Sequence, residues 1–137
     1  MLIDDSPHEH RLFKMALKEI DTNIIYIGCE DGEEGVKWLK ENLHNLPDMI
    51  FLDLKMPRMG GRESLIAIRK IPQLQSLPVI IYTTSSLSKE IDEMKQLGAT
   101  LFCTKPLYEH ITKVLKAIIY PDTLQTSAPV IKQHIFG

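Results

Sequence analysis

Five short apolar runs recur along the chain, separated by longer stretches with a different hydrophobic period. They begin near residues 2, 24, 49, 79 and 101, so successive runs lie 22, 25, 30 and 22 residues apart. This spacing is typical of βαβ units and is too long for hairpins. Most runs are continuously apolar, as strands covered on both faces are. The pattern predicts a parallel sheet with strands at Leu2–Asp4, Ile24–Cys29, Met49–Asp53, Val79–Tyr82 and Leu101–Cys103.

The stretches between these runs have the apolar period of helices. In the first, Leu12, Phe13 and Leu17 fall on one face, with Ser6 placed as N-cap and Pro7 as the first helical residue. Four more helices are predicted at about 33–43, 62–71, 88–97 and 108–120. A glycine, Gly98, ends the helix at 88–97. Right-handed crossovers would place these helices on both faces of the sheet, which defines a doubly wound α/β fold.

Composition and charge exclude several classes of protein. The chain has 137 residues, is 44% hydrophobic, and carries 16 basic and 18 acidic side chains for a formal net charge of −2. These values favour one soluble domain over disordered or collagen-like chains. Without a basic excess, direct nucleic-acid binding is not expected. No apolar run approaches the roughly 20 residues of a membrane helix and no charged-then-apolar leader opens the chain, so we expect no membrane association and a cytoplasmic location.

The C-terminal residues depart from this alternation. Residues 121–137 contain Pro121, Pro129 and several Ser, Thr and Gln residues before a small apolar group that includes Ile135. We therefore predict one domain at 1–120 and a tail or linker at 121–137, with a docking segment as the alternative. Cys29 and Cys103 lie in apolar stretches without Cys-x-x-Cys spacing, so both are predicted to be buried thiols.

Polar side chains follow four of the predicted strands directly. Asp4 and Asp5 end the first strand, Asp53 the third, Thr83 the fourth, and Lys105 lies just after the fifth. The carboxyl ends of parallel strands form the ligand site of an open α/β sheet. We therefore expect three carboxylates, a hydroxyl and an ammonium group to share one cleft.

Such a group of carboxylates is suited to a divalent cation. Neighbouring carboxylates repel one another unless a cation joins them. Mg²⁺ prefers oxygen ligands and retains waters, which suits direct ligation by Asp5 and Asp53 with Asp4 acting mainly through water. Lys105 and Thr83 could then bind phosphoryl oxygens, and Asp53 could itself be the nucleophile that forms an aspartyl phosphate. The residues thus predict a site that holds or receives phosphate.

The motifs at these strand ends are similar to those of a response-regulator receiver domain. The matching segments are Ile3-Asp4-Asp5-Ser6, Phe51-Leu52-Asp53-Leu54-Lys55-Met56-Pro57-Arg58-Met59-Gly60-Gly61, Pro78–Thr83, Gly98-Ala99 and Lys105-Pro106. The resemblance covers about residues 1–120, and the separations of 30 residues from Asp53 to Thr83 and 22 from Thr83 to Lys105 are common in the family. It implies a flavodoxin-like fold with five parallel strands in the order 2-1-3-4-5.

The resemblance also implies roles for individual residues. Asp53 would accept a phosphoryl group from a histidine kinase or phosphotransfer protein, and the backbone carbonyl of Lys55 would complete the Mg²⁺ ligands. Thr83 would move toward the phosphoryl group, Phe102 would turn inward, and the Lys105–Pro106 peptide would be cis. A downstream protein target, or a second copy of the chain, would bind the surface of the fourth helix, fifth strand and fifth helix. Such a protein is a switch with at most weak autophosphorylation and autodephosphorylation.

Some positions leave two interpretations open. Phe102 could be a switch residue or plain core, and the Lys55 side chain could shield the phosphoryl group or lie in solvent. His8 and His10, two apart on a helix, point in different directions and are predicted to be surface residues.

Three other classes of function compete with the receiver. A phosphohydrolase with an aspartyl nucleophile would need a carboxylic acid where Lys55 stands, and lysine cannot replace it. A nucleotide- or flavin-binding domain would need a phosphate-binding loop where Asp4 and Asp5 would repel the ligand. A phosphate-independent interaction module usually lacks one of the five site residues, all of which are present here.

Overall fold

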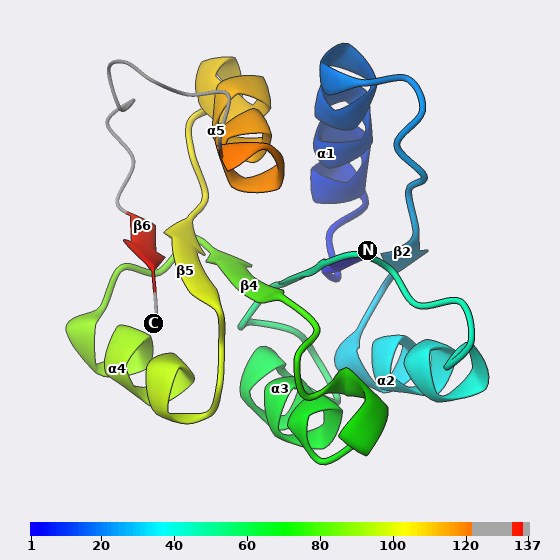
Figure 1. The fold of residues 1–137 in the computed structure, drawn as a ribbon. Helices are drawn as coiled ribbons and strands as arrows, with labels where there is room; N and C mark the ends of the chain where they lie inside the picture. The colour runs from blue at the N-terminus through cyan, green and yellow to red at the C-terminus, as the bar shows by residue number, and fades with distance from the viewer. Residues whose placement is uncertain (122–132, 136–137) are drawn as a thin grey trace.

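The computed structural model describes residues 1–121 and 133–135 and has three layers. Figure 1 shows a central sheet with α1 and α5 on one face and α2, α3 and α4 on the other. This is the doubly wound α/β arrangement predicted from the alternation of apolar runs and helical stretches.

The five predicted strands form the parallel part of the sheet. Their order is β2-β1-β3-β4-β5, and every neighbouring pair among them is parallel, which confirms the predicted topology. The bounds are β1 (Leu2–Ile3), β2 (Gly28–Cys29), β3 (Ile50–Leu52), β4 (Val79–Thr83) and β5 (Leu101–Thr104).

The second strand is shorter than predicted. Of the run 24–29, only Gly28 and Cys29 pair with β1, opposite Leu2 and Ile3. β1 itself has only two residues, so it offers no partner for the earlier part of the run. Ile25 is 83% exposed as a result, although the Ile27 carbonyl still accepts a hydrogen bond from the Leu2 amide at 2.8 Å.

The helices lie close to their predicted positions: α1 (Pro7–Ile20), α2 (Gly32–Glu41), α3 (Gly61–Arg69), α4 (Ser88–Gln96) and α5 (Ile111–Ile119), with 3₁₀ turns η1 (Pro72–Leu74) and η2 (Tyr108–His110). Ser6 caps α1 as predicted, since its hydroxyl accepts the Glu9 amide at 3.3 Å. The fifth helix was predicted from Tyr108, but that turn is η2. No side chain caps it, and an uncapped helix start often tightens into 3₁₀ geometry.

A sixth strand, β6 (Gln133–Ile135), was not predicted. It pairs antiparallel with β5, with Leu101 opposite Ile135 and Cys103 opposite Gln133. Figure 1 shows it at the edge of the sheet beside β5. Part of the predicted tail is therefore attached to the sheet, while most of its apolar group lies outside the described residues. The boundary between domain and tail at residue 120 stays a prediction.

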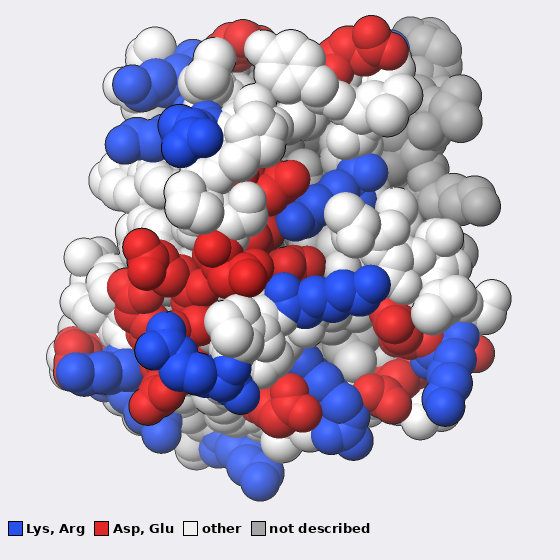
Figure 2. Space-filling view, turned by 180° about the vertical axis from the view of Figure 1, so that it is seen from behind, with Lys and Arg blue, Asp and Glu red and all other residues white. Residues whose placement is uncertain are grey.

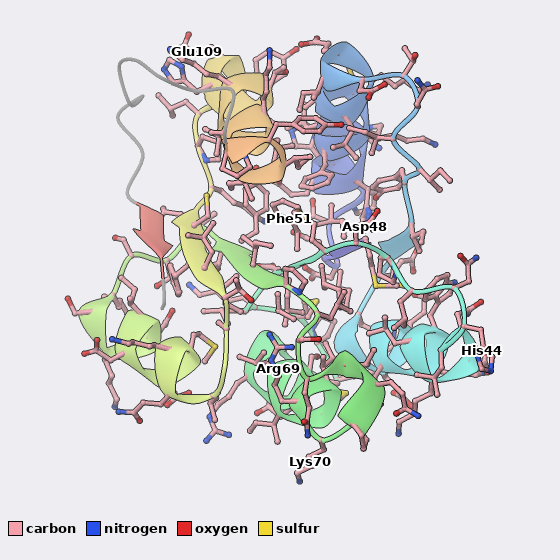
Figure 3. All side chains as sticks on the ribbon, viewed as in Figure 1. His44, Asp48, Phe51, Arg69, Lys70 and Glu109 are labelled. Atoms are coloured by element: carbon pink, nitrogen blue, oxygen red, sulfur yellow. The ribbon has the colours of Figure 1, made fainter. Side chains whose placement is uncertain are left out.

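A hydrophobic core lies on each face of the sheet, which explains why the strand sequences are continuously apolar. Alternate residues of each strand point to opposite faces. On the α1 and α5 face, Phe51 packs edge-to-face with Phe13 and Tyr82, at ring-centroid distances of 4.9 and 5.8 Å, and Figure 3 shows Phe51 between the sheet and that helical layer. The opposite core is mainly aliphatic and includes Ile81 and Phe102.

Loop contacts outside the two cores tie the helices of one layer together. The Arg69 guanidinium at the end of α3 donates to the carbonyls of Gly98 at 2.9 Å and of Leu74 and Leu77 at 2.8 Å each. Gly98 follows α4 with φ +99°, which suits its predicted place at a helix end. Both cysteines are free and buried, as predicted. In the described part of the chain, no helix has the length and apolar character to cross a membrane.

Candidate functional site

Three carboxylates converge at the carboxyl edge of the sheet. Asp4 and Asp5 follow β1 and Asp53 follows β3, and one oxygen of each lies within 4.8 Å of the others. Asp4 and Asp53 are 1% and 6% exposed, whereas Asp5 is exposed to solvent. Figure 2 shows acidic side chains gathered in a patch on this side of the molecule, with basic side chains beside it. The sheet topology thus brings together the acidic residues that the sequence singled out.

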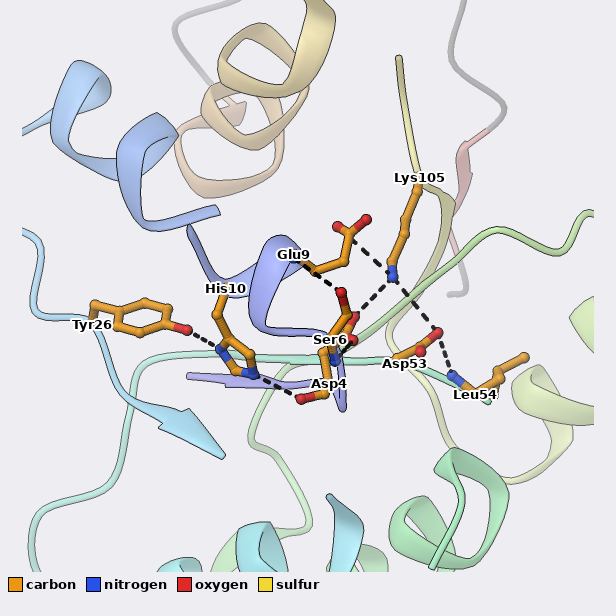
Figure 4. Close-up of polar contacts among 8 residues, drawn as sticks. All are labelled: Asp4, Ser6, Glu9, His10, Tyr26, Asp53, Leu54 and Lys105. Carbon is orange, nitrogen blue, oxygen red and sulfur yellow. Dashed lines mark hydrogen bonds and ion pairs between the residues drawn. The ribbon is translucent and has the colours of Figure 1, made fainter. Parts of the chain in front are cut away.

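Lys105 supplies the positive charge of the site. It follows β5, and its ammonium nitrogen lies 2.8 Å from Asp4 Oδ2 and 4.0 Å from Asp53 Oδ1 (Figure 4). Glu9 in the first turn of α1 also reaches it at 3.8 Å. Sequence reasoning missed Glu9, although its place one turn after Asp5 on a helix that begins at the site could have indicated it. One ammonium group therefore faces three carboxylates.

Asp53 is incompletely compensated. Its Oδ1 accepts the Leu54 amide at 2.9 Å. Burial raises the pKa of the Asp53 carboxyl, and the charge of Asp4 raises it further, while Lys105, Thr83 and the Leu54 amide act in the opposite direction. Desolvation is the largest of these effects. The ionised carboxylate is therefore under electrostatic stress that a further cation would relieve.

Thr83 and Phe102 lie on neighbouring strands beside this carboxylate. Both are fully buried. The Thr83 hydroxyl lies near enough to Asp53 to lower its pKa, yet it makes no hydrogen bond of normal geometry within the described residues. Ile81 pairs with Phe102, and Thr83 is two residues after Ile81, so Thr83 and Phe102 project from the same face of the sheet. The hydroxyl is thus a buried donor beside Asp53 whose hydrogen-bonding capacity is not fully used within the described residues.

The loop after Asp53 is held in place by contacts that the sequence did not reveal. Lys55 is exposed in this loop, and three residues later Arg58 has a positive φ of 64°. The Arg58 guanidinium donates to the buried Asp31 carboxylate. At the loop's other end, a Cβ on Gly61 would overlap the Asp53 carbonyl, so only glycine lets α3 begin this close to the acid.

Two predictions made from the sequence are wrong. All described peptide bonds are trans, including Lys105–Pro106, which was predicted to be cis. Trans is the intrinsically favoured isomer, and Lys105 reaches Asp4 without the cis form. His8 is exposed as predicted, but His10 is half-buried, and its Nε2 lies 2.7 Å from the Asp4 carbonyl oxygen. The helix turns His10 back toward the strand end, which residue spacing alone did not show.

The arrangement fits a hard divalent cation. Its donors are carboxylate oxygens, the ligands that Mg²⁺ and Mn²⁺ prefer. Asp5 is open to solvent, which leaves room for the waters that such ions keep.

Comparison with known proteins agrees with this geometry. The response regulator receiver domain family matches residues 1–118. The chain belongs to this family. The curated relatives of this receiver domain include the response regulator Rcp1 of Synechocystis, which is 32% identical over 109 residues that make up 77% of the chain and 74% of Rcp1. The chain is therefore a receiver domain of two-component signalling.

Other relatives carry the receiver as one part of a longer protein. The sensor histidine kinase CheAY of Helicobacter pylori is 31% identical over 120 residues, which cover 87% of this chain but 15% of the kinase. A protein-glutamate methylesterase of Myxococcus xanthus is 33% identical over 106 residues, 77% of this chain and 29% of that protein. The receiver thus spans a small part of the length of these two relatives.

Solved structures show the same fold. The phosphorylated cyanobacterial phytochrome response regulator RcpA has a TM-score of 0.78 at 27% identity, covering 91% of this chain and 96% of RcpA. The Mn²⁺-bound form of Rcp1 has a TM-score of 0.74 at 26% identity, covering 94% of this chain and 96% of that one.

Proposed function

We propose that this receiver is a phosphorylation-activated switch in which Asp53 accepts a phosphoryl group from the phosphohistidine of a histidine kinase or phosphotransfer protein. The observation that carries the proposal is the convergence of three carboxylates within 4.8 Å, beside the Lys105 ammonium group and the buried Thr83 hydroxyl, which makes no hydrogen bond of normal geometry within the described residues. This set can bind a cation and a phosphoryl group together. The phosphorylated state of RcpA and the Mn²⁺ in Rcp1 support the same chemistry by relationship.

Divalent metal would be held by the carboxylates of Asp5 and Asp53 and the backbone carbonyl of Lys55, with Asp4 acting through water. When bound, Mg²⁺ would supply positive charge that offsets the negative charge on the phosphoryl oxygens. We assign Mg²⁺ because it combines one or two carboxylates with phosphate oxygens and water. The exposure of Asp5 fits that mixed set of ligands.

Asp53 would perform the transfer itself. A carboxylate oxygen of Asp53 attacks phosphorus, the bond from phosphorus to the donor histidine nitrogen breaks, and the electron pair of that bond returns to the imidazole ring. Lys105 neutralises charge on the transferred group and, at 4.0 Å from Asp53, needs only a small shift to pair with it. The protein's part is therefore positioning and electrostatic stabilisation.

Thr83 and Phe102 would report the new charge. A phosphoryl oxygen on Asp53 would give the Thr83 hydroxyl a well-placed acceptor. Movement of Thr83 toward it would change the space available to Phe102 on the neighbouring strand. Such a response is a two-state equilibrium biased by added charge. Phe102 is already fully buried in this structure, so we expect a repacking around it rather than a swing from solvent.

The α4–β5–α5 surface would carry the output to a protein target or to a second copy of the chain. Three large apolar side chains flank it in exposed positions: Leu87 before α4 and Leu107 and Tyr108 after β5, exposed by 63%, 70% and 69%. Exposed apolar groups of this size are suited to protein contacts. β6 pairs along the hydrogen-bonding edge of β5. A partner would therefore contact side chains beside β5 and would not add a strand to that edge.

Intact mass spectrometry after incubation with acetyl phosphate and Mg²⁺ tests the acceptor directly. We expect a gain of one phosphoryl group in the parent, none in Asp53→Asn, and none with a chelator. Asp48→Asn is the matched control, because Asp48, labelled in Figure 3, is an exposed aspartate that precedes β3, whereas Asp53 follows that strand. A full gain in Asp53→Asn would show that the acceptor is wrong.

Two other results would select the alternatives. If neither acetyl phosphate nor beryllofluoride with Mg²⁺ bound to the parent, a phosphate-independent interaction module would replace the switch. Rapid multiple-turnover release of inorganic phosphate would indicate a phosphohydrolase, in spite of Lys55 at the position where a carboxylic acid is needed.

A further inference from the structure

His10 links Asp4, at the end of β1, to Tyr26, which lies just before β2. It lies in α1, and its ring sits between two oxygen atoms that come from different parts of the chain (Figure 4). Nε2 is 2.7 Å from the backbone carbonyl oxygen of Asp4, and Nδ1 contacts the hydroxyl of Tyr26, just before β2. The three residues form a continuous chain of hydrogen bonds.

The chemistry of the partners sets the direction of this chain. A carbonyl oxygen only accepts, so His10 Nε2 must donate to Asp4. In the neutral ring the other nitrogen then accepts, and the Tyr26 hydroxyl donates to Nδ1. Burial raises the pKa of Tyr26 to about 12, so this hydroxyl keeps its proton at neutral pH. Tyr26 therefore selects the tautomer of His10 that can hold the Asp4 carbonyl.

Neighbouring residues hold the Tyr26 ring in place and leave space for its contact with His10. The Tyr26 ring packs against Phe13, with the ring centroids 6.3 Å apart. A Cβ on Gly28 would lie 2.7 Å from the Tyr26 hydroxyl and 3.0 Å from His10 Nδ1, so a larger residue there would displace the contact. The space left by Gly28 and the packing of the Tyr26 ring thus keep the Tyr26 hydroxyl against Nδ1 of His10.

The group that His10 holds lies between two of the clustered acids. The Asp4 carbonyl belongs to the peptide bond that joins Asp4 to Asp5, so its orientation sets where the Asp5 side chain leaves the backbone. Asp4 is fixed further by the Ser6 amide at 2.9 Å and by Lys105 at 2.8 Å. Asp5 is exposed, so surrounding side chains do not pack it in place. Its direction depends on the backbone.

We infer that His10, oriented by Tyr26, is a positioning residue that aims the Asp5 carboxylate at the divalent cation. This rests on the metal binding in the proposed function and adds a role for two residues outside the acidic cluster. Groups that hydrogen-bond behind a metal ligand typically change metal affinity by about 10- to 100-fold when they are removed. His10 acts one step further back, through the peptide that carries the ligand.

Calorimetric titration of the metal-free protein with Mg²⁺, and separately with Mn²⁺, tests the inference. We expect His10→Leu to weaken binding about 10-fold, at the lower end of that range. His10→Gln should restore most of the affinity, because its amide nitrogen can take the place of Nε2 and donate to Asp4. Tyr26→Phe should have a smaller effect than His10→Leu. The matched control is His8→Leu, an exposed histidine on the same helix, which should bind like the parent.

The ¹⁵N resonances of the His10 ring give a second readout that needs neither metal nor phosphate. We expect the parent to show the tautomer protonated on Nε2, and Tyr26→Phe to shift the population toward the other form. A parent spectrum dominated by protonation on Nδ1 would overturn the hydrogen-bond chain.

The outcomes separate the two proposals. If the parent binds Mg²⁺ and His10→Leu binds it equally well, the positioning role is wrong and the proposed function stands. Equal losses of affinity in His10→Leu and His10→Gln, together with equal falls in unfolding midpoint, would show that His10 acts only by packing. If the parent itself binds no divalent metal, both proposals fail.

Discussion

Asp31 and Asp53 are two buried aspartates with opposite electrostatics. They are 4% and 6% exposed, and each stands at the start of a segment that borders the site. Asp31 caps α2, where Oδ1 accepts the Glu34 amide at 2.9 Å and Oδ2 accepts from Arg58. These contacts, the backbone hydrogen bond first, lower the pKa of Asp31. For Asp53, burial outweighs the contacts and the pKa is raised.

The difference distinguishes a carboxylate that stabilises the fold, Asp31, from one that is available for chemistry, Asp53. Asp31 has donors for both oxygens, so its charge stabilises the fold and holds the loop that follows Asp53. Asp53 shares the Lys105 ammonium with Asp4 and Glu9, so a further cation would relieve the remaining negative charge. A buried acid left short of partners is a reasonable place to look for function.

Removing Asp31 should have the largest effect on stability. Asp31→Ala loses a helix cap, worth about 1 kcal/mol, and a charge-assisted hydrogen bond worth about another 1 kcal/mol. We expect the free energy of unfolding to fall by about 2 kcal/mol in urea titrations, the sum of these two contributions. Asp53→Asn in metal-free buffer should lose no stability, because it removes an under-compensated buried charge. Equal losses in the two variants would refute the contrast.

Mg²⁺ should stabilise the protein most where Asp53 is intact. A ligand at ten times its dissociation constant stabilises the folded state by about 1.4 kcal/mol. We expect thermal unfolding of the parent and of Asp31→Ala to shift upward by similar amounts, and that of Asp53→Asn to shift much less. An equal shift in Asp53→Asn would place the cation elsewhere.

The pH dependence of stability should differ in sign between the two acids when a chelator is present. Asp53 has a raised folded pKa, so the folded state binds more protons and stability falls as pH rises through that pKa. The advantage of Asp53→Asn over the parent should therefore shrink as pH falls through the same range. Asp31 has a lowered folded pKa, so its stabilising charge is lost only at lower pH. Urea midpoints of Asp31→Asn and Asp53→Asn between pH 3 and 7, on either side of the ordinary aspartate pKa of about 3.9, would test this.

Arg58→Gly should have the smallest effect. Glycine relieves the left-handed backbone at this position, a gain of about 1 kcal/mol, while the loss of the Asp31 ion pair costs a similar amount. Arg58→Ala loses the ion pair without relieving the backbone, so it should be less stable than Arg58→Gly by about 1 kcal/mol. If alanine and glycine were equivalent in urea titrations, the backbone would carry no strain.

The outline of the site could be predicted because a parallel sheet imposes it. Polar residues that end parallel strands of one sheet meet at its carboxyl edge, so the strand spacing was enough to predict that Asp4, Asp53 and Lys105 lie together. The contacts that hold these residues could not be predicted in this way. They join loops and helix turns whose directions depend on packing, as with Arg58 and Asp31, or His10 and Tyr26.

The sequence by itself determined the alternation of strands and helices and the acids and lysine of the site, because these follow from hydrophobic period and chain connectivity. The strand order 2-1-3-4-5 was implied by the resemblance to receiver domains. The tertiary structure alone decided how each acid is compensated. It also decided the shortness of β2, the trans Lys105–Pro106 bond and the pairing of β6 with β5. Those features depend on which groups compete for the same space and the same hydrogen bonds, and that competition exists only once the chain is folded.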